Sequence, residues 1–254
     1  MPDHTIFNER PESQDRALKV IERLGYTIVP RSEAERKRGS RKAVLFTEEL
    51  QAFLSKQTYR FGSETRYFSG GAIARAMQAV DQNSVAGLYA ANKEIYELIC
   101  SGKSMEEELP DGTRQSFDIR YIDFEHPENN TFQVTDEFEV ERPNGKFVRP
   151  DLVVLVNGIP LVVIECKKSS VDVMEGVTQN IRNWGEDYIP HLFRYAQLVM
   201  AMNPDKVLYG TCGTPAKYFV SWHEDNKDWL NDWCRKCSPD GQIREQDRAL
   251  VSQR

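Results

Sequence analysis

The 254-residue sequence lacks an uninterrupted apolar run of about 18 residues, the length that a membrane-spanning helix needs. Its first residues, MPDHTIFNERPESQ, are polar and acidic, whereas a secretory leader has basic residues followed by an apolar stretch. The five cysteines are few and odd in number, which argues against a disulfide framework. We therefore expect a cytoplasmic protein with reduced thiols and no membrane association.

Several function-bearing motifs are also missing. No Gly-x-x-x-x-Gly-Lys-Ser/Thr sequence occurs, so the chain has no phosphate-binding loop for ATP. It has no helix-turn-helix or other base-reading motif. The single Cys-x-x-Cys pair, Cys234 and Cys237, would have to recruit Cys212 and His223 to complete a structural zinc site, so zinc is the disfavoured interpretation. The formal net charge of −6 argues against coating nucleic acid through bulk positive charge.

What is present is typical of a soluble globular protein, with 40% hydrophobic and 28% charged residues. Hydrophobic periodicity predicts helices over residues 11–25, 47–57 (capped by Thr47), 72–80, 84–102, 171–185, 191–196 and 227–237. It predicts strands over residues 26–29, 117–124, 131–142, 151–166 (as a hairpin), 197–203, 206–212 and 218–222. Residues 58–71 show no clear period and are expected to be a loop. The fold class is therefore α/β (α+β), a mixed central sheet flanked by helices and preceded by an N-terminal helical region.

The most hydrophobic hairpin, RPDLVVLVNGIPLVVIECKK (149–168), carries charge at its ends. Two almost unbroken apolar runs are typical of strands buried on both faces, where charge is costly. Glu165 and Lys167 lie two positions apart and share a face. Asp151 joins that face only if it pairs with Glu165, which needs an odd-length connection such as Asn157-Gly158-Ile159, or a β-bulge. A plain two-residue Asn-Gly turn would place the two carboxylates on opposite faces.

Two carboxylates brought together repel each other unless a cation lies between them. Oxygen ligands favour a hard ion such as Mg²⁺, and the Cys166 backbone carbonyl could add a third ligand. A nearby ammonium, that of Lys167, could orient a metal-bound water or stabilise charge on phosphorus. The alternative is a set of solvated ion pairs at the strand ends, Asp151 with Lys168 or Glu165 with Lys167. The pattern favours a metal-dependent phosphodiesterase.

Pro150-Asp151 and Glu165-Cys166-Lys167 resemble the PD-(D/E)xK nuclease core. More narrowly, the chain resembles the N-terminal nuclease domain of the restriction (motor) subunit of type I restriction–modification enzymes. The segments that carry this wider resemblance, in the family's order, are LGYTIV (24–29), AANKEIYELICSG (90–102), IDFEHPENNTFQVTDEFEVE (122–141), IPHLFRYAQLVM (189–200) and LYGT (208–211).

The resemblance implies a restriction-endonuclease-like fold and Mg²⁺-dependent, sequence-nonspecific DNA cleavage. It gives Asp151, Glu165 and Lys167 the catalytic roles, with Asp151, Glu165 and the Cys166 carbonyl as metal ligands. A glutamine in a Gln-x-x-x-Tyr pattern supports such sites; Gln179 matches it, but Asn183 stands at the tyrosine position, so only the glutamine role carries over. Related nucleases often add an acidic residue from an upstream helix. Glu94 and Glu97 are candidates, although solvated helix residues are the simpler interpretation.

The resemblance also implies an organisation and a set of partners. We expect an N-terminal helical and extended region at 1–80, a nuclease core at 81–222, and a C-terminal helix and linker at 223–254. That linker would lead to helicase-like motor domains absent from this chain, and ATP would bind only to the full-length subunit. Expected partners are DNA and the methyltransferase and specificity subunits. Two alternatives remain open: a catalytically silent docking or DNA-positioning module, and a stand-alone repair nuclease. The basic segment 31–42 is either a local basic surface or a solvated loop.

Overall fold

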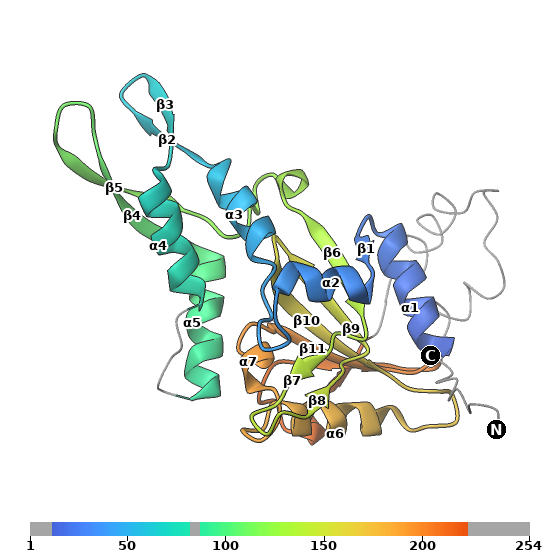
Figure 1. The fold of residues 1–254 in the computed structure, drawn as a ribbon. Coiled ribbons are helices and arrows are strands. Elements are labelled where there is room, and N and C mark those ends of the chain that lie inside the picture. Colours follow the sequence, from blue (N-terminus) through green and yellow to red (C-terminus); the bar gives the residue numbers. More distant parts are fainter. Residues whose placement is uncertain (1–11, 82–86, 223–254) are drawn as a thin grey trace, which may run out of the picture.

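The computed structural model describes residues 12–81 and 87–222, which form a central sheet with helices on both faces (Figure 1). Its helices are α1 (Glu12–Arg23), α2 (Arg31–Arg38), α3 (Thr47–Ser55), α4 (Gly70–Asp81), α5 (Leu88–Ser101), α6 (Val173–Asn183) and α7 (Pro190–Phe193). Its strands are β1 (Thr27–Val29), β2 (Thr58–Phe61), β3 (Glu64–Tyr67), β4 (Lys103–Glu108), β5 (Arg114–Ile119), β6 (Phe132–Asp136), β7 (Val140–Glu141), β8 (Phe147–Val148), β9 (Leu152–Val156), β10 (Ile159–Cys166), β11 (Leu198–Met202), β12 (Val207–Gly210) and β13 (Val220–Ser221).

The central sheet has seven strands in the order β1-β6-β9-β10-β11-β12-β13. The pairs β1–β6 and β10–β11 are parallel and the other pairs are antiparallel. The predicted mixed sheet flanked by helices is therefore confirmed. β1 comes from the segment assigned to the N-terminal region, so that region contributes an edge strand to this sheet.

Strand β9 is buried on both faces, as its unbroken apolar run predicts. Val153 belongs to the core that contains Val177 of α6. Leu152 belongs to a second core, which contains Leu18 of α1. Because side chains alternate along a strand, Asp151 shares the α6 side of the sheet with Val153. Figure 1 shows α6 below the sheet and α1 beside β1.

The β9–β10 hairpin contains both a tight turn and a bulge. Asn157 and Gly158 have φ values of 50° and 80° and form a two-residue turn between Val156 and Ile159, which pair directly. The register then shifts between Pro160 and Val162. Proline has no N–H to donate to the ladder, which suits it to this irregular position. Beyond the shift, the pairing of Ile164 with Leu152 brings the next two residues, Glu165 and Asp151, opposite each other. Of the two predicted solutions, an odd-length connection or a bulge, the structure has the bulge.

Several expectations about local structure are wrong. The strand expected over 117–124 ends at Ile119. Residues 58–71 are not a loop, since β2 and β3 pair as a hairpin, in which Tyr59 stacks on Phe117 with ring centroids 4.1 Å apart. That contact comes from a distant hairpin, β4–β5, which local periodicity cannot reveal; Figure 1 shows the two hairpins extending from the same side of the body. The strand expected over 131–142 breaks at Glu137, whose φ is 48°. Thr47 is the first residue of α3, and no side chain caps that helix.

The basic segment 31–42 is a helix, α2, followed by a turn, rather than a solvated loop. Most of its charge is neutralised within the protein. Arg31 pairs with Glu35 at 3.1 Å and with Glu139 at 2.9 Å, and Lys37 pairs with Glu49. These contacts disfavour a basic surface for nucleic acid there. The C-terminal helix, Cys234 and Cys237 lie outside the described residues. In the part of the chain that is described, no helix is long and apolar enough to cross a membrane.

Candidate active site

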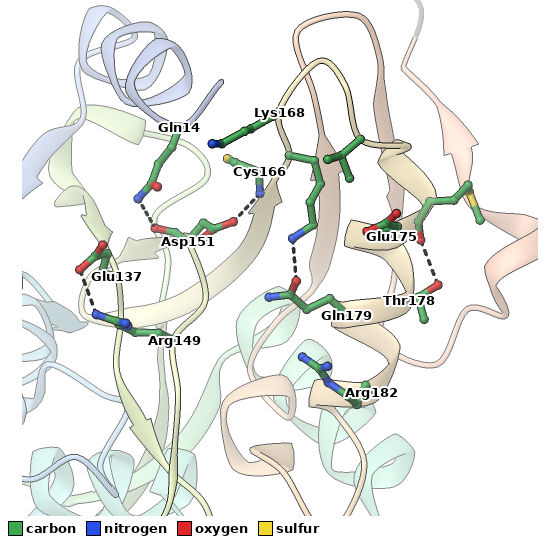
Figure 2. A pocket seen from close by; sticks show the side chains of 13 residues that line it. Gln14, Glu137, Arg149, Asp151, Cys166, Lys168, Glu175, Thr178, Gln179 and Arg182 are labelled. Carbon is green, nitrogen blue, oxygen red and sulfur yellow. Dashed lines mark hydrogen bonds and ion pairs between the residues drawn. The ribbon is translucent and has the colours of Figure 1, made fainter. Parts of the chain in front are cut away.

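A cleft of about 810 Å³ opens where the β9–β10 hairpin ends and α6 begins (Figure 2). Asp151, Cys166, Lys167 and Gln179 line it. Glu165 is 0% exposed and lies beneath them. Figure 2 shows Asp151 beside Cys166, with Gln179 facing them from α6. The structure thus brings Asp151, Glu165, Lys167 and Gln179 to one place on the α6 side of the sheet.

Backbone contacts fix the position of Asp151. Its Oδ2 accepts a hydrogen bond from the Cys166 N–H at 2.7 Å. The N–H and C=O of one strand residue point to the same side, so the Cys166 carbonyl is directed toward the Asp151 side of β10. The Asp151 carbonyl accepts hydrogen bonds from the Glu137 N–H at 2.9 Å and from Gln14 Nε2 at 3.2 Å. The N-terminal helix therefore helps to hold the first carboxylate.

Gln179 bridges the ammonium and the second carboxylate. Lys167 Nζ donates to Gln179 Oε1 at 2.6 Å, and Gln179 Nε2 donates to Glu165 Oε2 at 2.6 Å. Gly176 allows this contact, because a Cβ there would lie 3.0 Å from the Ala201 Cβ and 3.5 Å from the Glu165 Cβ. Without a side chain at that position, α6 packs closely on β10 and β11. Lys167 Nζ lies 3.9 Å from Glu165 Oε2; the Glu165 side chain is fully buried and that of Lys167 is 18% exposed, so this is not a solvated ion pair at a strand end.

Asn183 also contacts the site, although its place in the sequence predicted no role for it. Its Nδ2 donates to Glu165 Oε1 at 3.4 Å. Its Oδ1 is buried and has no hydrogen-bond partner among the described residues. The available signal was the spacing: Asn183 lies one helical turn after Gln179, on the same polar stripe of α6. Asparagine thus supports the second carboxylate at the position where the resemblance expects tyrosine.

The two candidate helper glutamates on α5 are not at the cleft. Glu97 is exposed and pairs with Lys93 at 3.7 Å. Glu94 and Glu97 line a separate depression beside α5. Besides Asp151, the cleft lining contains two acidic residues: Glu175 on α6, and Glu137, which pairs with Arg149 at 3.3 Å. The sequence alone could not place Glu137 at the cleft, because β6 ends at Asp136, just before this residue.

The carboxylates perturb each other. Burial raises the pKa of Glu165 well above its ordinary value, and the negative charge of Asp151 raises it further, while the Lys167 ammonium lowers it. Burial also raises the pKa of Asp151, against the hydrogen bond from Cys166 N–H and the charge of Lys167. Such mutual repulsion is relieved when a cation lies between the two groups.

The donor set fits a hard divalent cation. Asp151, Glu165 and the Cys166 carbonyl offer oxygen atoms only, which is the preference of Mg²⁺. Residues 12–81 and 87–222 contain no group of three or more His, Cys, Asp or Glu side chains that could hold a metal. A metal here would therefore be held by two carboxylates and completed by the carbonyl, water and substrate oxygens, as Mg²⁺ sites at phosphates often are.

Replacing Glu165 with glutamine is expected to stabilise the metal-free protein at neutral pH by roughly 1–3 kcal/mol. Glutamine keeps an acceptor for Gln179, and a flip of the Asn183 amide would give the new N–H₂ group the unpartnered Oδ1. The folded pKa of Glu165 lies above the unfolded value of about 4.3. As pH rises from the unfolded pKa to the folded pKa of Glu165, ionisation of this group therefore lowers the free energy of unfolding of the wild type. Below about pH 4 the group is protonated in both states, so the stability advantage of Glu165→Gln should vanish.

Urea denaturation in EDTA at several pH values measures this difference in free energy of unfolding. The matched control is Glu97→Gln, which removes the same charge from an exposed position on α5. A pH-independent difference between Glu165→Gln and the wild type would contradict the raised pKa.

Comparison with known proteins places the chain in a family. The model of the type I restriction enzyme R protein N terminus matches residues 6–218. The HindI endonuclease subunit of Haemophilus influenzae is 25% identical over 225 residues, covering 85% of this chain and 20% of that protein. The putative MjaIXP endonuclease subunit of Methanocaldococcus jannaschii is 32% identical over 138 residues, covering 54% and 13%. The chain thus spans a fifth or less of these two relatives. It belongs to the family of type I restriction enzyme R protein N-terminal domains.

Proposed function

We propose that this chain is the Mg²⁺-dependent DNA endonuclease portion of a type I restriction enzyme subunit. Its relatives are named as endonuclease subunits of such enzymes. The observation that carries the proposal is the pairing of Asp151 with Glu165 across two strand ends, with Lys167 on the same face. Such an arrangement could hold a divalent cation and place an ammonium beside a phosphodiester that undergoes hydrolysis.

Each residue has a distinct part in the proposed reaction. Asp151, Glu165 and the Cys166 carbonyl would hold Mg²⁺, which when bound supplies an acidified water and neutralises charge on the phosphate. The Lys167 ammonium orients the attacking water or stabilises the charge that develops on phosphorus. Gln179 fixes the direction of that ammonium, because its carbonyl oxygen accepts from Nζ while its amide group donates to Glu165.

Specificity for sequence is expected to come from elsewhere. Without a base-reading motif, contacts to backbone phosphates would supply most of the DNA affinity, so cleavage should be sequence-nonspecific and should weaken with salt. We infer that DNA recognition belongs to a specificity subunit, and that methyltransferase subunits and helicase-like motor domains complete the assembly. A DNA-positioning module without activity is the second candidate, and the enclosure of Glu165 beneath Gln179 favours it.

Cleavage of supercoiled plasmid with and without Mg²⁺ tests the proposal. The variant Lys167→Met keeps the length of the side chain but removes the ammonium, and we expect it to lower the cleavage rate roughly 100-fold. The control is Lys93→Met, which removes an exposed ammonium from α5, away from the cleft. Metal-independent cleavage, or equal rates for Lys167→Met and the wild type, would contradict the proposal. A wild-type chain that binds DNA but never cleaves it would favour the positioning module instead.

A further inference from the structure

Two arginines from different parts of the chain lie against one tyrosine ring beside the cleft. The Arg142 guanidinium carbon is 4.0 Å from the centroid of the Tyr188 ring, and that of Arg182 is 5.4 Å from it. Both distances fall within the range of cation–π attraction. We call Arg142, Arg182 and Tyr188 the Tyr188 cluster.

The backbone holds the cluster in place. Arg142 follows β7, and its Nε donates to the Asp187 carbonyl at 2.9 Å. Arg182 lies in the last turn of α6. The Tyr188 N–H donates to the Gly185 carbonyl at 2.9 Å, which closes the turn after α6. The position of both guanidiniums at the ring thus follows from a fixed turn and a helix end, not only from side-chain rotamers.

The cluster carries positive charge that the described part of the chain does not neutralise. Arg31 and Arg149, by contrast, both pair with Glu137. Neither Arg142 nor Arg182 forms an ion pair with a carboxylate among residues 12–81 and 87–222, although Glu186 and Asp187 are exposed nearby. The face of an aromatic ring offsets only part of this charge. Two like charges in one place favour the binding of an anion.

The cluster is continuous with the candidate active site. Arg182 lines the same cleft as Lys167 and Gln179, and Figure 2 shows it one turn beyond Gln179 on α6. Its charge also lowers the pKa of Glu165, which indicates that it lies within electrostatic range of the carboxylates. An anion at the cluster would therefore lie next to the bond-breaking position rather than on a separate face.

We propose that the Tyr188 cluster binds a phosphodiester group of the DNA backbone, adjacent to the one held at Asp151 and Glu165. A guanidinium matches phosphate oxygens through two parallel hydrogen bonds, and two guanidiniums can grip a single diester. The cluster would then set the position at which a DNA strand enters the cleft. This inference rests on the proposed nuclease function, because that function makes DNA the molecule that runs across the cleft.

The test measures binding of a fluorescent DNA duplex in EDTA, where no cleavage occurs, across a series of salt concentrations. We expect the double variant Arg142→Gln/Arg182→Gln to lower affinity at least tenfold at low salt. We also expect it to reduce the slope of log K against log salt by about 1, since the variant no longer neutralises one phosphate and each phosphate contributes about one unit. The matched control is Arg66→Gln/Arg114→Gln, which removes a half-buried and an exposed arginine from the distant hairpins and should leave the slope unchanged.

The outcomes separate this inference from the proposed function. An unchanged slope in the cluster variant, with Mg²⁺-dependent plasmid cleavage intact, would overturn the inference and leave the nuclease standing. A reduced slope shared equally by the control variant would also overturn it. If the wild type bound poly-glutamate as tightly as DNA, and the cluster variant bound neither, the cluster would be a site for an acidic protein surface instead. Absence of both DNA binding and cleavage in the wild type would contradict the proposed function itself.

Discussion

Replacing Asp151 with asparagine is expected to lower Mg²⁺-dependent DNA cleavage by roughly 10³-fold or more, because loss of a metal ligand removes several kcal/mol of transition-state stabilisation. The fold should survive the change. Asparagine still offers an oxygen to the Cys166 N–H. It also removes the carboxyl group of Asp151, whose pKa is raised by burial. The metal-free variant should therefore be at least as stable as the wild type at neutral pH, so that activity and stability change in opposite directions.

Plasmid cleavage rates and thermal unfolding in EDTA measure these two effects. The control Asp118→Asn neutralises an exposed aspartate on β5, away from the cleft, and should change neither. Cleavage by Asp151→Asn within about tenfold of the wild-type rate would remove Asp151 from the metal site, since the absence of a ligand costs more than that. A large drop in melting temperature would instead assign Asp151 a structural role.

Replacing Gly158 with alanine is expected to destabilise the protein by about 3 kcal/mol or more. Gly158 has a φ of 80°, which is strained for any residue with a side chain. A Cβ there would also lie 2.3 Å from the Phe46 carbonyl oxygen, which is backbone and cannot rotate away. The Phe46 N–H donates to the Gly158 carbonyl at 2.9 Å, so relief of the clash would disrupt the entry to α3.

The control is Gly112→Ala, which has almost the same backbone angle, φ 81°, but no atom within 4 Å of the added Cβ. It should cost only the backbone strain, about 1 kcal/mol. Urea denaturation of both variants gives the difference in free energy of unfolding. Equal destabilisation by Gly158→Ala and Gly112→Ala would show that the close approach to Phe46 adds nothing to the cost of a side chain at position 158.

The sequence predicted which charged residues of the hairpin meet, but not the turn geometry that brings them together. The charges at the strand ends pointed to Asp151, Glu165 and Lys167, and the alternation rule required a bulge or an odd loop. The structure combines the Asn157-Gly158 turn with a bulge after Pro160, because Asn157 is buried and its Nδ2 donates to the Tyr121 carbonyl at 3.0 Å. That partner is distant in sequence, so no local pattern could choose between the two solutions.

Contacts between remote segments explain the other features that were missed. Asn183 was visible on the polar stripe of α6, but its contact with Glu165 depends on how closely the helix packs, which Gly176 sets. The Tyr188 cluster joins the end of β7 to the turn after α6, two segments whose sequences show no common pattern. Helices α1, α4, α5 and α6 were predicted because amphipathic periodicity is a local property.

Mn²⁺ binding followed by electron paramagnetic resonance, with Mn²⁺ standing in for Mg²⁺, tests most directly whether Asp151 and Glu165 together hold one divalent ion. We expect one saturable site per chain in the wild type. Mg²⁺ should compete for it, and both Asp151→Asn and Glu165→Gln should abolish it. Mn²⁺ binding that persists unchanged in either variant, or that is absent from the wild type, would contradict a metal site built on these two carboxylates.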